Sequence, residues 1–125
     1  HEHDKKNDIE RLMNTMPEDL AKHILSKHDI TSAGFTIETP FNLEMFSAWL
    51  QNYLYYKRSS LLRVKGILAF RDMGERYIFH SVRGSYLFEV GEPWGDEKPF
   101  SKIVFIGKGI NKGELGEILL QLTKE

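Results

Sequence analysis

The stretch that decides the fold lies at residues 61–70 and reads LLRVKGILAF. Its length and apolar content are typical of a buried β-strand, yet Arg63 and Lys65 stand in its middle. Side chains alternate between the two faces of a strand, so the two cations share one face and Val64 and Gly66 share the other. Two interpretations stay open. Either the cations lie on the solvent face and protect the sheet from aggregation, or they contact an acidic partner while Gly66 allows close backbone approach.

One strand-like run precedes this stretch and three follow it, at residues 34–38, 76–82, 85–90 and 102–106. Arg83 and Gly84 form a two-residue hairpin turn between the second and third of these runs, and residues 72–74 predict another turn. Residues 103–106 are apolar on both faces, which indicates an interior strand. The sequence therefore predicts an antiparallel meander.

Helical periodicity appears in three places. Asn42 is a suitable N-cap for an apolar stripe that runs from Leu43 to Leu54, and Asn111 with Glu114 precedes a second stripe that ends at Leu122. Residues 9–29 repeat apolar positions at helical spacing, with a capping box at residues 15–18 that implies two helices. We predict an α+β fold with a largely antiparallel sheet of four to five strands, helices on one face, and an N-terminal helical segment.

Composition limits the function classes. The 125 residues have 41% hydrophobic content and a formal charge of -1, which predicts one globular domain with no overall field for nucleic acid or anionic membrane. The chain has no cysteine and no apolar run of membrane-spanning length, so we expect a cytoplasmic protein. It begins with His1 rather than Met, and we therefore expect a piece of a longer protein.

Motifs for catalysis are absent from the sequence. Neither GxxxxGK[ST] nor GxGxxG occurs, and Gly107 and Gly109 fit a strand-to-helix turn better than a phosphate site. His80 has no partner in a nucleophilic pattern and is expected to be a hydrogen-bonded structural residue. We therefore predict that this chain has no catalytic site and binds no cofactor.

One short run could hold a metal. His1 and His3 alternate beside Asp4, so both imidazoles can point the same way in an extended chain and share Zn²⁺ or Co²⁺ with a carboxylate. His23 and His28 lie five positions apart and point away from each other on a helix. The predicted metal ligands are therefore His1 and His3.

An RNA-binding platform is the alternative from another class. Five arginines and Lys65, between positions 58 and 83, lie near four aromatic residues that could stack on bases, which are Phe70, Tyr77, Phe79 and Tyr86. An RNA-recognition strand needs aromatic side chains on its exposed face, but Ile67 and Ala69 occupy those positions after Lys65 and Gly66. Nucleic-acid binding is therefore not the favoured interpretation.

The chain resembles the C-terminal domain of the CobW family. The resemblance is carried in order by five segments: PFNLEMF at 40–46, the RxKG core at 63–66, RYIFHSV at 76–82, Pro93-Trp94, and KIVFIGKGIN from 102. It implies that residues 1–8 end a linker rich in His and Asp and that 30–125 form the family's α+β domain. The helical segment at 9–29 departs from the family, whose members often pass almost directly from the linker into the first strand.

The resemblance also implies a function. The parent protein would be a P-loop GTPase that uses GTP and Mg²⁺ and delivers zinc, cobalt or a related metal, whereas this chain would be non-catalytic. Its expected partners are the GTPase domain of the same protein and the metal-receiving client, with Arg63, Lys65 and Gly66 as docking residues. A freestanding α+β module that binds RNA or protein remains the alternative.

Overall fold

The structure is a computed structural model, and it describes residues 30–83 and 85–124. The predicted helical segment at 9–29, together with His1 and His3, lies outside the described residues. The elements follow in the order β1 (Ile30–Ile37), α3 (Leu43–Tyr56), β2 (Leu61–Leu68), β3 (Glu75–Val82), β4 (Ser85–Pro93), β5 (Ser101–Lys108) and α4 (Lys112–Gln121).

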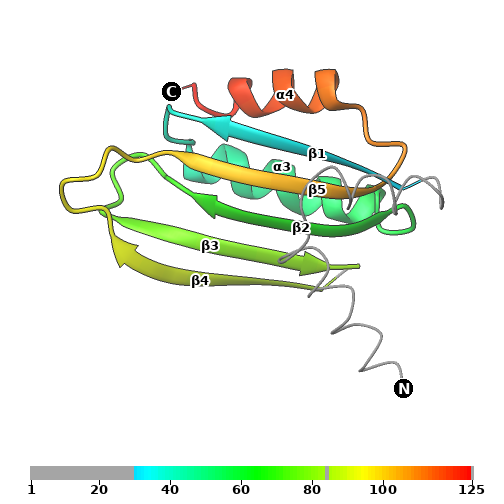
Figure 1. Cartoon of the computed structure of the whole chain (residues 1–125), viewed down its shortest axis with the longest axis horizontal. Coiled ribbons are helices and arrows are strands. Elements are labelled where there is room, and N and C mark those ends of the chain that lie inside the picture. The colour runs from blue at the N-terminus through cyan, green and yellow to red at the C-terminus, as the bar shows by residue number, and fades with distance from the viewer. Residues whose placement is uncertain (1–29, 84, 125) are drawn as a thin grey trace.

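The strands form one antiparallel sheet with the order β1-β5-β2-β3-β4 (Figure 1). As predicted, β5 is an interior strand, because β1 and β2 pair with its two sides. The predicted meander is correct for β2, β3 and β4 but wrong for β5, because the chain crosses from the edge strand β4 back to the far side of β2. β2 and β3 are also interior, whereas β1 and β4 form the edges. The two-residue turn after Val82 is confirmed by the pairing of Val82 with Ser85, and Arg83 adopts the positive φ of 62° that such turns require.

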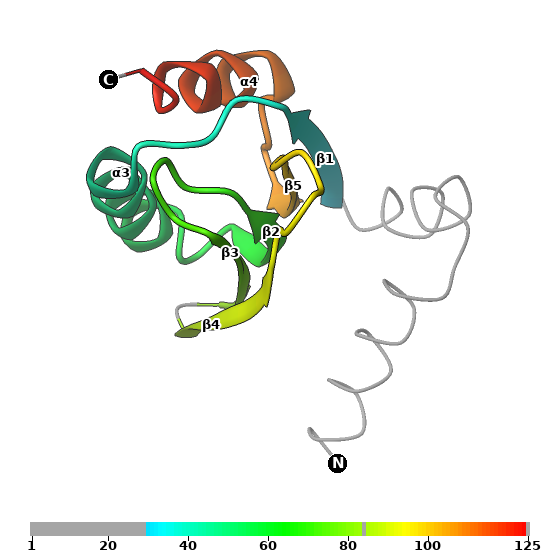
Figure 2. The same ribbon diagram turned by 90° about the vertical axis from the view of Figure 1, so that its left-hand side faces the viewer.

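Both helices cover the same face of the sheet, as Figure 2 shows. Their apolar stripes supply Phe46, Leu50 and Leu54 from α3 and Leu115 and Leu119 from α4, all buried in the core. The sheet contributes five buried residues to the same core, which are Val64, Leu68, Phe79, Ile103 and Phe105. The predicted α+β fold, with helices packed on one face, is confirmed.

Local capping explains where the helices begin. The Asn42 side chain accepts a hydrogen bond from the Met45 N–H at 3.1 Å, and Asn111 accepts one from Glu114 at 3.0 Å. Each bond satisfies an amide that the first turn of a helix leaves unpaired. Within the described residues, no helix has the length and hydropathy needed to cross a membrane.

Candidate functional site

The sheet face opposite the helices carries two of the three residues that the sequence predicted for docking, Arg63 and Lys65. Gly66 lies on the other face, in register with the core residues Phe79 and Ile103. We define the open face as nine residues from the three interior strands. They are Arg63, Lys65 and Ile67 of β2, Ile78, His80 and Val82 of β3, and Lys102, Val104 and Ile106 of β5. Register places them in three rows across the sheet. The open face therefore has five apolar residues, three cationic residues and His80, and no carboxylate belongs to these nine positions.

Arg63 differs from the sequence-based expectation. The interpretation that both cations lie on the solvent face holds for Lys65, which is exposed, but is wrong for Arg63, which is only 5% exposed. Register places Arg63 between Val82 on one side and Ile106 on the other.

Gly66 allows the close backbone approach that the sequence suggested. A Cβ at this position would lie 3.1 Å from the Lys102 carbonyl oxygen and 3.2 Å from the Ile103 Cβ. These distances are tighter than ordinary van der Waals contact, so a side chain would press on the neighbouring strand β5. Gly66 therefore serves the packing of β2 against β5, and its role in docking stays a prediction.

Metal ligands do not gather among the described residues. Residues 30–83 and 85–124 contain no group of three or more His, Cys, Asp or Glu side chains placed to hold a metal ion. His80 is half-buried on the open face, where it pairs with Lys65 and Leu87. Gly109 adopts φ of 65° in the link from β5 to α4, which fits the predicted strand-to-helix turn.

Of the four aromatic side chains proposed for RNA stacking, Tyr86 is exposed, but the other three do not form a platform. Phe70 and Phe79 are 3% and 0% exposed and pack in the core beneath the helices. Tyr77 is half-buried and contacts Phe70 edge-on with ring centres 5.4 Å apart. Buried rings cannot stack on bases, so the arrangement of these three residues does not favour RNA recognition.

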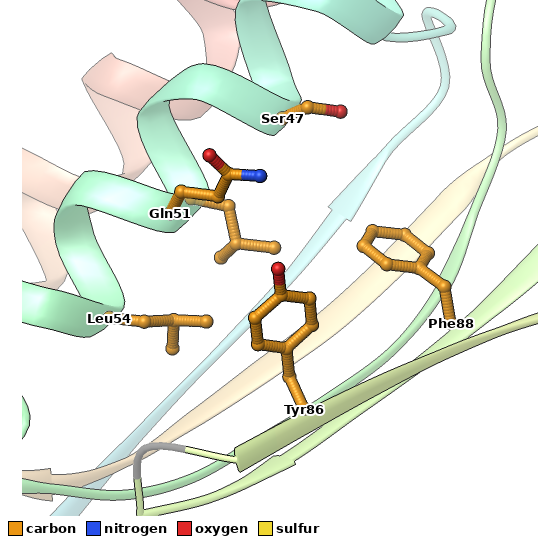
Figure 3. Close-up of a pocket in the computed structure, with 6 residues that line it drawn as sticks. Ser47, Gln51, Leu54, Tyr86 and Phe88 are labelled. Carbon is orange, nitrogen blue, oxygen red and sulfur yellow. The ribbon is translucent and has the colours of Figure 1, made fainter.

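The structure reveals a groove that sequence reasoning missed, between α3 and the edge strand β4. One pocket of about 200 Å³ is lined by Ser47, Leu50, Gln51, Leu54, Tyr86 and Phe88. A neighbouring pocket of about 240 Å³ shares Leu54 and Tyr86 and adds Tyr55 and Arg58. Figure 3 shows Tyr86 and Phe88 directed from the sheet toward α3, and we call this feature the α3–β4 groove. The apolar run at 86–90 was its sequence signal.

Arg58 is the charged residue at one end of the α3–β4 groove. Its guanidinium lies 4.2 Å from the centre of the Tyr55 ring and donates a hydrogen bond to the Tyr55 carbonyl at 2.6 Å. These two contacts orient the cation beside an exposed aromatic surface. The α3–β4 groove therefore combines an apolar wall with a positioned positive charge.

One tyrosine on the helix side has a shifted pKa. Tyr53 stacks on Trp49 with ring centres 4.9 Å apart and meets Phe105 edge-on at 5.7 Å. Burial raises the pKa of Tyr53 above its usual value, and the negative charge of Glu114 raises it further. The phenol therefore stays protonated and packs as a neutral core residue.

Comparison with known proteins identifies one family and a relative within it. Residues 30–123 match the family described as the cobalamin synthesis protein cobW C-terminal domain. The zinc chaperone YjiA of Escherichia coli is 33% identical over 98 residues, which cover 78% of this chain and 31% of that protein.

Solved structures agree with the sequence matches. The zinc-bound crystal structure of the E. coli YjiA GTPase aligns with a TM-score of 0.73 and 33% identity, over 77% of this chain and 30% of that one. A zinc-bound triple mutant of the same GTPase aligns equally well. This chain spans about a third of the length of these relatives. It belongs to the CobW family, as a C-terminal domain of that family.

Proposed function

We propose that this chain is the regulatory and client-recognition domain of a cytoplasmic GTP-dependent metallochaperone that delivers zinc, cobalt or a related metal. The family match over residues 30–123 supports this proposal, as does the name of the zinc chaperone relative. The chain spans about a third of that relative. We therefore assign the binding of GTP and Mg²⁺ and the hydrolysis of GTP to the rest of the parent protein. The chain itself is proposed to hydrolyse no GTP.

The open face is the proposed docking surface. Lys65 and Lys102 are exposed and belong to neighbouring strands, and Arg63 adds a third cation beneath them. Exposed Ile67 adds apolar area beside Lys102. Such a surface complements a partner with carboxylates around an apolar centre, because opposite charges steer association and the apolar contact stabilises the complex. The GTPase domain and the metal-receiving client are the two proposed partners.

Charge reversal tests this surface. We expect the double variant Lys65→Glu, Lys102→Glu to lower the affinity for the separately produced GTPase domain by at least tenfold, since like charges then oppose each other. Isothermal titration calorimetry at two salt concentrations measures the effect. Lys112→Glu, at an exposed position in α4 on the other side of the sheet, is the matched control. Unchanged affinity in the folded double variant would refute the open face as the docking surface.

Metal contact by this chain is proposed for His1 and His3 alone. We expect weak Zn²⁺ binding, because two imidazoles and a carboxylate supply an incomplete ligand set. Calorimetric titration of the chain and of a His1→Ala, His3→Ala variant measures it. Equal zinc affinity in the two proteins would remove these residues from the proposal.

The alternative function is a module that binds RNA or protein independently of a GTPase. The burial of Phe70 and Phe79 removes two of the rings on which bases would stack. Titration with single-stranded RNA distinguishes the alternatives. Strong, salt-dependent RNA binding by the wild-type chain would favour the independent module and contradict docking on a GTPase domain.

A further inference from the structure

The strand β4 leaves one side of its backbone available for pairing. β4 is an edge strand, and β3 is its strand neighbour among the described residues. Hydrogen bonding shows which residues face outward. The Arg83 N–H bonds the Leu62 carbonyl, so odd-numbered residues of β3 face β2 and even-numbered ones face β4. His80 and Ile78 therefore bond their partners Leu87 and Glu89.

The alternate residues of β4 direct their N–H and C=O groups away from the sheet. These residues are Tyr86, Phe88 and Val90, which pair with Ser81, Phe79 and Tyr77 at the positions without ladder hydrogen bonds. The same residues are 48%, 36% and 66% exposed. An edge with outward backbone groups and exposed apolar side chains is a template for another strand.

Natural sheets usually protect such an edge, and β4 lacks the usual devices over its first six residues. Residues 85–90 contain no lysine, arginine or proline, and Glu89 is the charge within them. Leu87, on the other side of the strand from the α3–β4 groove, is also 53% exposed. Both sides of the strand therefore present apolar area that water contacts in the isolated chain.

We propose that β4 pairs with β4 of a second copy of this chain, in an antiparallel register centred on Phe88. The proposal is separate from docking through the open face, because it uses the sheet edge. The register uses all three outward-facing residues: Phe88 opposes Phe88 of the second copy and Tyr86 opposes its Val90. Aromatic pairs and pairs of aromatic with β-branched side chains are favourable across strands.

Charge favours the register centred on Phe88 over the register shifted by one residue. A shift of the centre to Glu89 would place two carboxylates opposite each other, whereas the Phe88 centre pairs Leu87 with Glu89 of the second copy. At the ends of the pair, the Arg83 turn of each copy lies near Glu92 of the other, so opposite charges meet. The two-fold axis is perpendicular to the sheet, and the two α3–β4 grooves lie on the same face of a continuous sheet.

Charge variants test the register. We expect the mass from sedimentation velocity to rise from 14.6 kDa toward twice that value between roughly 10 and 500 µM, a range typical of small interfaces. Leu87→Glu should weaken self-association by about fivefold or more, because each dimer then holds two Glu–Glu pairs. Adding Glu89→Lys to Leu87→Glu should restore it. Leu120→Glu, at an exposed position of α4, is the matched control and should have no effect.

Amide hydrogen exchange supplies an independent readout. In the dimer, the amides of Tyr86, Phe88 and Val90 should become protected as concentration rises, while those of Leu87 and Glu89 are protected at every concentration. A chain that stays monomeric, with exchange at the three outward amides independent of concentration, overturns the proposal. So does a dimer whose stability is unchanged by Leu87→Glu, since that dimer uses another surface.

Discussion

Gly107 lies where β5 passes closest to the start of β2. A Cβ at this position would be 2.6 Å from the Ser60 carbonyl oxygen and 2.9 Å from the Leu61 Cα. Both contacts are backbone atoms, so they cannot turn aside as a flexible side chain would. The same Ser60 carbonyl accepts a hydrogen bond from the Lys108 N–H at 2.8 Å. Substitution of Gly107 by Ala should therefore force the two strands apart.

The expected cost follows from two contributions. Overpacking a close-packed site costs about 1–3 kcal/mol, and weakening one backbone hydrogen bond adds about 0.5–1.5 kcal/mol. We expect Gly107→Ala to lower the free energy of unfolding by about 2–4 kcal/mol. Gly34→Ala is the matched control in the adjacent strand β1, because among the described residues a Cβ there would meet only the Val104 Cγ2, at 3.7 Å. It should be neutral or stabilising by up to about 1 kcal/mol, since alanine restricts the unfolded chain.

Urea unfolding measures both variants. The fluorescence of Trp49 and Trp94 reports on the core and on the loop after β4. With a urea dependence of about 2 kcal/mol/M, Gly107→Ala should lower the unfolding midpoint by about 1–2 M, with an unchanged slope. If the free energy of unfolding of Gly107→Ala lies within about 0.5 kcal/mol of the wild-type value, the backbone contact does not have the predicted effect.

Two further predictions concern buried polar groups. Because the pKa of Tyr53 is raised in the folded protein, the free energy of unfolding should fall as pH rises above the unfolded-state value of 10.0, and Tyr53→Phe should reduce that fall. Urea unfolding of the wild type and of the variant at pH 9 and 11 measures the fall in each protein. An equal fall in the two proteins would contradict the role given to Tyr53. Ser101 is fully buried and its Oγ accepts a hydrogen bond from the Ala69 N–H at 2.9 Å. Ser101→Ala should cost about 1–3 kcal/mol in thermal unfolding, and a loss equal to that of exposed Ser85→Ala would refute this role.

Local chemistry made most of the fold predictable. The side chains of Asn42 and Asn111 cap helices by bonding an amide three residues ahead, so their effect is readable from a few positions. Strand alternation likewise depends on neighbouring residues alone. The element order, the hairpin turn at Arg83 and the interior position of β5 followed from these local signals.

Burial was harder to predict than the face on which a residue lies. Alternation placed Arg63 and Lys65 on the same face, but Arg63 is buried whereas Lys65 is exposed. The pairing of β2 with β3 followed from the predicted turn at residues 72–74, whereas the pairing of β2 with β5 did not. Burial depends on what covers a residue in the folded chain, so the burial of Arg63 could not be read from its own segment.

The sequence by itself determined the elements and the family, because caps, turns and alternating apolar positions act within a few residues of one another. The predicted meander holds for β2, β3 and β4 but not for β5, which lies between β1 and β2. The tertiary structure alone decided the strand order, and with it the surfaces. It placed β2 in the interior, where Arg63 is buried and Lys65 is exposed, and β4 at the edge, which exposes Tyr86 and Phe88 beside α3. Pairing between strands joins residues far apart in the chain, so the open face and the α3–β4 groove exist only once the sheet has formed.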